Sequence, residues 1–102
     1  MGYYTDYELK VSDESLIDTI AEEMSEFTDY KWDKSLALYD VKWYNWQSDI
    51  REISSRHPNV LFTLDGAGEE SGDIWRVYAK NGKIQLEKAK ITFEAFNEEK
   101  LK

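Results

Sequence analysis

Few side chains in this chain of 102 residues could carry out catalysis. There is no cysteine, and its absence excludes a thiolate nucleophile and a cysteine zinc site. The chain has only one histidine, His57. A Ser/His/Asp relay would have to use His57, but no serine lies in the sharp glycine-flanked turn that presents such a nucleophile. His57 continues the apolar spacing of Trp46, Ile50 and Ile53. We therefore expect it to bond a last-turn carbonyl or interact with the helix dipole, rather than to act in catalysis or bind a metal.

A second group of polar side chains lies in the run DGAGEESGD, residues 65–73, whose glycine and acid content predicts a loop. Its carboxylates do not follow the calcium-loop pattern, which places ligands at alternate positions before a central glycine. We expect Glu69 or Glu70 to bond loop amides or a nearby arginine. Contact with a partner is the alternative, and metal binding is expected least. The four carboxylates are Asp65, Glu69, Glu70 and Asp73.

The strongest chemical signal is an excess of carboxylates near the start of the chain. Residues 13–29 contain seven acids and no lysine or arginine, and apolar residues recur among them at helical spacing. At 100° per residue, most of the acids fill the half of a helix opposite the apolar arc. Asp18, Glu22 and Glu26 stand at i, i+4 and i+8, where like charges repel and cost stability. The pattern favours a negative surface for a basic protein partner, with contacts at Glu14, Asp18, Glu22, Glu23, Glu26 and Asp29.

The charge of the whole chain is acidic and uneven. The formal net charge is −8, with 12 acids and 5 bases in residues 1–51 but 9 acids and 8 bases in residues 52–102. This balance argues against direct nucleic-acid binding, which depends largely on lysine and arginine. It fits steering toward a positively charged surface, and the alternative is that the acids only keep the protein well solvated.

The order of elements is predicted as strand, helix, strand, helix and three strands. Alternation and helical spacing place strands at 3–11, 36–43, 60–64, 74–80 and 83–86, and helices at 13–28 and 45–56. Two strand–helix–strand units imply a mixed sheet with both helices on one face. The fold class is therefore α+β, a two-layer sandwich forming a single domain over residues 1–102.

Four local signals refine this order. Ser12 is a plausible N-cap for the first helix, and a bulge near residues 39–40 would reconcile the two phases of the second strand. Asn81-Gly82 predicts the two-residue tip of a hairpin. A bulge or tight turn is expected near residues 87–88, because Ala89, Ile91, Phe93 and Ala95 alternate in a new phase.

The chain is rich in aromatic residues, with four Trp, seven Tyr and four Phe. Most are expected in the core, but the sheet face opposite the helices must hold residues such as Tyr4, Trp75 and Lys83 or their neighbours. Exposed rings there would form a docking or dimerisation patch. Stacking of single-stranded RNA on such a face is a further possibility that the negative charge disfavours.

The sequence predicts a cytoplasmic protein without membrane contact. No run approaches the roughly 20 apolar residues that a membrane span needs. The N-terminal residues also lack the basic and apolar regions of a secretory signal.

The segment Lys42–Lys83 (KWYNWQSDIREISSRHPNVLFTLDGAGEESGDIWRVYAKNGK) carries a Trp-led helix, a His-Pro turn, an LF-x-L strand, the run GEESGD, then IW and an NGK hairpin. In this it resembles small uncharacterised proteins of bacteriophages and mobile elements. The resemblance implies a ferredoxin-like sandwich and a phage-type origin, with a bacterial host cytoplasm as the setting. It implies no catalytic residues, and small phage proteins are often inhibitors or modulators of host systems.

We therefore predict an acidic, non-enzymatic binding protein with no cofactor or metal. It would engage and inhibit or modulate a basic host protein, which could itself bind nucleic acid, as an anti-defence inhibitor would. Glu69, Glu70 and Trp75 are predicted as further contacts. The alternative is a structural or assembly module that self-associates through its open sheet face or an edge strand, and the expected state is a monomer or weak homodimer.

Overall fold

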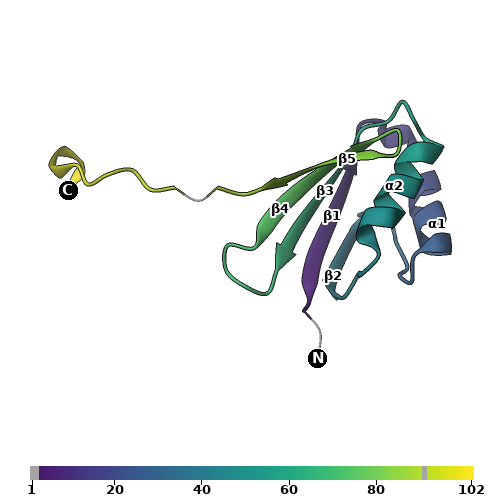
Figure 1. Cartoon of the computed structure of the whole chain (residues 1–102), viewed down its shortest axis with the longest axis horizontal. Helices are drawn as coiled ribbons and strands as arrows, with labels where there is room; N and C mark the ends of the chain where they lie inside the picture. Colours follow the sequence, from purple (N-terminus) through teal and green to yellow (C-terminus); the bar gives the residue numbers. More distant parts are fainter. Residues whose placement is uncertain (1–2, 91) are drawn as a thin grey trace.

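A computed structural model describes residues 3–90 and 92–102. Five strands form one sheet, and two helices cover one of its faces, so the chain is a two-layer α+β sandwich (Figure 1). The elements are β1 (Thr5–Val11), α1 (Ile17–Phe27), β2 (Ala37–Val41), α2 (Trp46–Arg56), β3 (Phe62–Gly68), β4 (Ile74–Lys80) and β5 (Lys83–Lys88), with short 3-10 turns at Glu14–Leu16 and Glu98–Lys100. The predicted order of strands and helices is confirmed.

The predicted mixed sheet is wrong. The strand order is β2-β1-β3-β4-β5, and every neighbouring pair is antiparallel. The reason lies in residues 29–36, which follow α1 and carry the chain back, so that β2 begins beside the end of β1. The backbone N–H of Leu9 donates to Leu36 O at 2.8 Å on this return path. β2 and β3 run in the same direction, as a crossover through α2 requires, but β1 lies between them.

Two of the predicted local features are confirmed. In β2 the register shifts between Leu38 and Val41, and Asp40 at this bulge has φ of 53°. Asn81 and Gly82, with φ of 51° and 79°, form the tip of the β4–β5 hairpin. Positive φ at both positions is what a two-residue type I′ turn requires.

Neither the bulge nor the tight turn expected near residues 87–88 occurs in the described part of β5. β5 stays in register with β4 through Lys88, and the N–H of Ala89 still donates to Ile74 O at 2.9 Å. The first residue of β4, Ile74, extends one position beyond β5 and accepts this hydrogen bond, so the pairing continues although the apolar phase changes. Ile91, which belonged to the predicted alternation, lies outside the described residues.

Ser12 does not cap the first helix. The carboxylate of Asp13 accepts the backbone N–H of Ser15 at 3.1 Å and caps the 3-10 turn that precedes α1. The hydroxyl of Ser12 instead accepts the N–H of Leu61 at 2.9 Å. The end of β1 is thereby tied to the chain entering β3.

The core lies between the sheet and the two helices, which share one sheet face as predicted (Figure 1). Trp43 packs edge-on against Tyr7 and Trp32, with ring centroids 5.2 and 5.3 Å apart. Each helix contributes only one apolar face. Among the described residues the helices reach 11 residues, and none has the length and apolar character of a membrane span. The side chains with no exposed surface are Ile20, Met24, Ile50, Ile53, Ser54, Phe62, Leu64 and Val77.

Candidate protein-binding surface

The outer face of α1 is the candidate site. Ile20 and Met24 are fully buried on the inner face of this helix, so the positions opposite them face solvent. Asp18, Glu22 and Glu26 are all exposed and follow one another at single-turn spacing, about 6 Å along the axis. In the described part of the chain, no lysine, arginine or histidine forms an ion pair with any of the three. We call Asp18, Glu22 and Glu26 the acidic face.

Glu14 and Asp29 extend the acidic face beyond the two ends of α1, and both are exposed. The field of Asp29 reaches Asp49 in the first turn of α2. Burial raises the pKa of the Asp49 carboxyl, and the negative charge of Asp29 adds to this effect. The indole N–H of Trp43, which donates to Asp49 at 2.7 Å, acts in the opposite direction. Negative potential therefore continues from α1 toward the start of α2.

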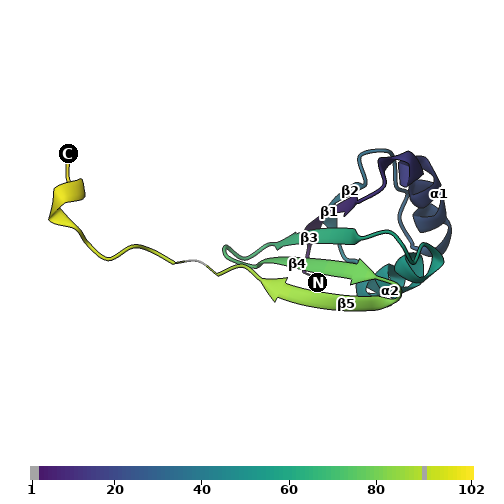
Figure 2. The same cartoon turned by 90° about the horizontal axis from the view of Figure 1, so that it is seen from above.

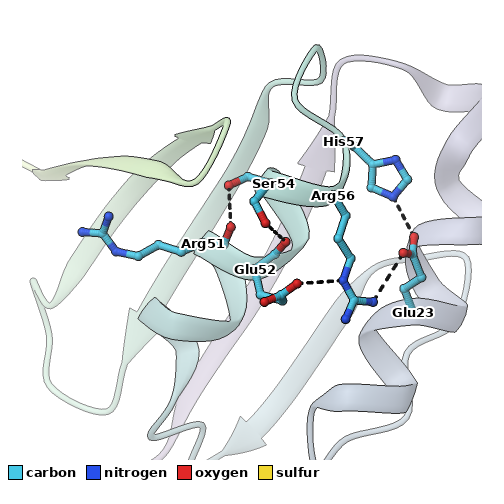
Figure 3. Close-up of polar contacts among 7 residues, drawn as sticks. Glu23, Arg51, Glu52, Ser54, Arg56 and His57 are labelled. Carbon is cyan, nitrogen blue, oxygen red and sulfur yellow. Dashed lines mark hydrogen bonds and ion pairs between the residues drawn. The ribbon is translucent and has the colours of Figure 1, made fainter.

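Glu23 differs from its neighbours because it bonds to the second helix (Figure 3). One carboxylate oxygen lies 2.6 Å from Nε2 of His57, and the other lies 3.5 Å from Nη1 of Arg56. Nε of Arg56 also donates to Glu52 at 2.9 Å, and the two carboxylates, Glu52 foremost, raise the pKa of Arg56. Glu23 thus joins α1 to α2, and we leave it out of the acidic face.

His57 lies at the end of the second helix, where the sequence analysis placed it. It caps the end of α2 and is half-buried, with 18% of its side chain exposed. Its partner is the Glu23 carboxylate rather than the last-turn carbonyl that we expected. Sequence spacing could not identify this contact, because Glu23 and His57 are 34 positions apart and meet only when the helices pack.

The loop at residues 69–73 is fastened to the start of the first strand. Glu69 accepts the backbone N–H of Tyr4 at 2.8 Å, so its partner is an amide just before β1 rather than the loop amide or arginine that we expected. The hydroxyl of Tyr3 donates to Asp73 at 2.7 Å and accepts the N–H of Glu70 at 2.9 Å. No cluster of three potential metal ligands occurs among the residues that the structure describes.

Trp75 does not lie on the open face of the sheet, where we expected it. Its ring stacks on Trp46 at 4.8 Å and meets Tyr7 edge-on at 5.8 Å, within the helix-covered layer. Trp75 pairs with Gly66 across the ladder, and a Cβ at Gly66 would clash with the indole. The sequence contained the signal, because Trp75 is in phase with Val77 and Ala79, both of which are buried.

The open face carries a row of charges and, beside it, a groove that the sequence analysis missed. Glu8, Asp65, Arg76 and Glu87 stand side by side on four strands. Arg76 donates to Asp65 through Nε at 2.6 Å and Nη2 at 3.0 Å, and these bonds raise the pKa of Arg76. The groove has a volume of about 490 Å³, and the side chains that form its apolar part are Tyr39, Ala67, Ile74 and Ala89.

Comparison of this chain with protein-family models, with curated proteins and with solved structures finds no match. Any inference about the function of these surfaces therefore depends on the contacts and exposures described above. Three features stand out among the described residues. They are the acidic face on α1, which forms no ion pair with any basic side chain that the structure describes, the contacts of Glu23 with His57 and Arg56 that join the two helices, and the apolar groove on the open face of the sheet.

Proposed function

We propose that the protein is a non-enzymatic binding protein whose acidic face engages a partner protein with a basic surface. One observation carries the proposal. Asp18, Glu22 and Glu26 form an exposed row with no cationic partner in the described chain, although Arg56 pairs with Glu23 and Glu52 close by. Repulsion along this row costs stability, and a partner's lysines and arginines would relieve it.

The distribution of charge supports this role. The first half of the chain carries nearly all of the net negative charge, so its field would orient the protein with α1 toward a positive surface and raise the association rate. A regular row of carboxylates also suits a basic surface that normally receives the phosphates of a nucleic acid. Such a nucleic-acid-binding protein is the form of partner that we favour.

The resemblance of residues 42–83 to small bacteriophage proteins supports a partner in a bacterial host, with the protein acting in the host cytoplasm. Within this proposal, the specific function is inhibition or modulation of a host protein, such as a component of a defence system. The same resemblance supports describing the sandwich as a variant of the ferredoxin-like fold.

The test compares capture of host proteins from a bacterial lysate by three full-length chains. One is the wild type, and the second carries Asp18→Lys, Glu22→Lys and Glu26→Lys. The third, a matched control, carries the same charge change in the exposed C-terminal segment, at residues 94, 98 and 99. A partner held by the wild type and the control but lost by the α1 variant supports the proposal.

Two further measurements accompany the capture. Binding of the captured partner should weaken as salt is added, because exposed charge pairs are screened. The melting temperature of the α1 variant should stay close to that of the wild type, because all three positions are exposed. If the α1 variant binds the same partner as strongly as the wild type, the acidic face only solvates the protein and the proposal fails.

A further inference from the structure

The C-terminal segment, residues 92–102, exposes large apolar side chains away from the body of the protein. Phe93 is 91% exposed, Phe96 80% and Leu101 65%. In both views the segment extends beyond the end of β5 (Figures 1 and 2). The radius of gyration, 16.5 Å, exceeds the roughly 13 Å of a compact chain of this length. Apolar residues gathered in this way mark an interaction site rather than ordinary surface.

This segment is poorly suited to folding back on its own sheet. The stretch between Lys88 and Phe93 contains no glycine, proline, asparagine or aspartate, the residues that reverse a chain tightly. Its β-branched residues favour extended backbone instead. A segment of this composition reaches another molecule more readily than its own open face.

The groove on the open face suits the rings of such a segment. Its lining includes the small side chains of Ala67 and Ala89, which lie on either side of Ile74, and the larger side chains of Tyr39 and Arg76. The groove is lined by residues of all five strands and has a volume of about 490 Å³. The two bonds to Asp65 hold the guanidinium of Arg76 in a fixed plane at the rim. A fixed guanidinium offers a surface on which an aromatic ring can stack.

We propose that two copies of this chain exchange their C-terminal segments, so that Phe93 and Phe96 of each copy occupy the open-face groove of the other. Each segment leaves its own sheet at Ala89, which lines the groove. Two facing grooves can therefore donate and receive segments reciprocally about a two-fold axis. This self-association uses the side of the sheet opposite the helices and leaves the acidic face free.

Charge allows the exchange. Residues 89–102 contain three lysines and three glutamates, so the segment is formally neutral by its side chains, while the rest of the chain carries the net charge of −8. A neutral segment can dock on an acidic body without like-charge repulsion of its own. Added salt should leave the association unchanged or strengthen it, because screening weakens the repulsion between the two bodies.

Size also allows it. From Ala89, where the segment leaves the sheet, the seven residues to Phe96 reach about 23 Å when extended, whereas the five strands that line the groove are spaced over about 19 Å. Each buried ring removes about 150–250 Å² from water, so the four rings bury about 600–1,000 Å², to which the covered groove surfaces add a smaller amount. An interface of this size is at the small end of the range for specific complexes, which fits a dimer that forms only as concentration rises.

The first test is the mass of the full-length protein in solution, measured by analytical ultracentrifugation over a range of concentrations. We expect a concentration-dependent dimer. The double substitution Phe93→Ser, Phe96→Ser should weaken the dimer about tenfold or more. It cannot disturb the core, because both rings are exposed. Ala67→Glu, which fills the groove, should do the same, whereas Tyr44→Ser, at an aromatic residue 78% exposed elsewhere, should leave the dimer intact.

Mixing the two weakened variants tests the arrangement itself. The Phe93→Ser, Phe96→Ser chain keeps its groove, and the Ala67→Glu chain keeps its segment. In a mixture, the intact segment of one chain can enter the intact groove of the other. Heterodimers should therefore form, although neither variant by itself forms homodimers. A wild type that stays monomeric, or a mixture without heterodimers, overturns the proposal. If the wild type is monomeric but Ala67→Glu abolishes capture of a host protein, the groove binds a different protein. The α1 triple variant should still dimerise, which separates this test from that of the acidic face.

Discussion

The two faces of the sheet differ in what their side chains do. On the helix-covered face, Leu64 and Val77 have no exposed surface. Their neighbours Asp65 and Arg76, one position along the same strands, form an ion pair on the open face. The covered face therefore provides the packing that holds the fold together, while the open face and the outer side of α1 are free to bind other molecules. Substitutions on the two sides should separate stability from binding.

The largest effect is expected from neighbouring residues of β3. Leu64→Ala should lower the free energy of unfolding by about 2–5 kcal/mol, because it leaves a cavity in the core. Thr63→Ala, which points to the open face, should cost less than about 1 kcal/mol. Chemical denaturation followed by tryptophan fluorescence measures both values. Equal costs would contradict the division between the two faces.

The next effect concerns the close approach of Gly66 and Trp75 on the covered face. Gly66→Ala should cost about 1–3 kcal/mol, because the new methyl group overlaps the indole. In a Trp75→Leu background the same substitution should cost much less, since the smaller side chain can move aside. A double-mutant cycle measures this coupling, and additive costs would show that the two positions do not interact.

A smaller effect is expected at the contact between Glu23 of α1 and His57 at the end of α2. His57→Gln should lower stability by about 1 kcal/mol, because the close contact with Glu23 is replaced by a weaker one. Glu22→Gln, one position from Glu23 but on the outer side of α1, should leave stability nearly unchanged. His57→Gln should also retain partner binding. Lost binding at an unchanged melting temperature would mean that His57 belongs to the binding surface.

The smallest effect is a pH dependence at Asp49. Its pKa is raised in the folded protein from an ordinary value of 3.8, so ionising this carboxyl costs more in the folded state than in the unfolded state. Its contribution to stability is therefore greatest below pH 3.8 and falls as pH rises through the folded pKa. Asp49→Asn keeps an oxygen that can accept the Trp43 N–H and removes this dependence.

We expect the stability of the wild type relative to Asp49→Asn to decline as pH rises from about 3 to 7. Denaturation curves of both proteins across this range give the difference directly. A difference that stays constant, or that grows with pH, would show that the carboxylate is stabilised rather than penalised beside Asp29.

Elements that depend on neighbouring residues were predictable. The hairpin at Asn81-Gly82 requires residues that tolerate positive φ, and the bulge near Asp40 follows from a change of apolar phase within one strand. The exposed row on α1 follows from helical spacing alone. For the candidate site, the same spacing identified Asp18, Glu22 and Glu26 as exposed, but it could not distinguish them from Glu23.

By itself, the sequence determined the kinds and order of the elements and the acidic side of α1, because these depend on spacing within a few turns or strand residues. Only the tertiary structure decided the antiparallel order of the strands, the bonding of Glu23 to α2 and the burial of Trp75. Each of these depends on which segments pack together over long sequence separations. The groove arises in the same way, since its lining residues come from all five strands, which come together only in the folded sheet.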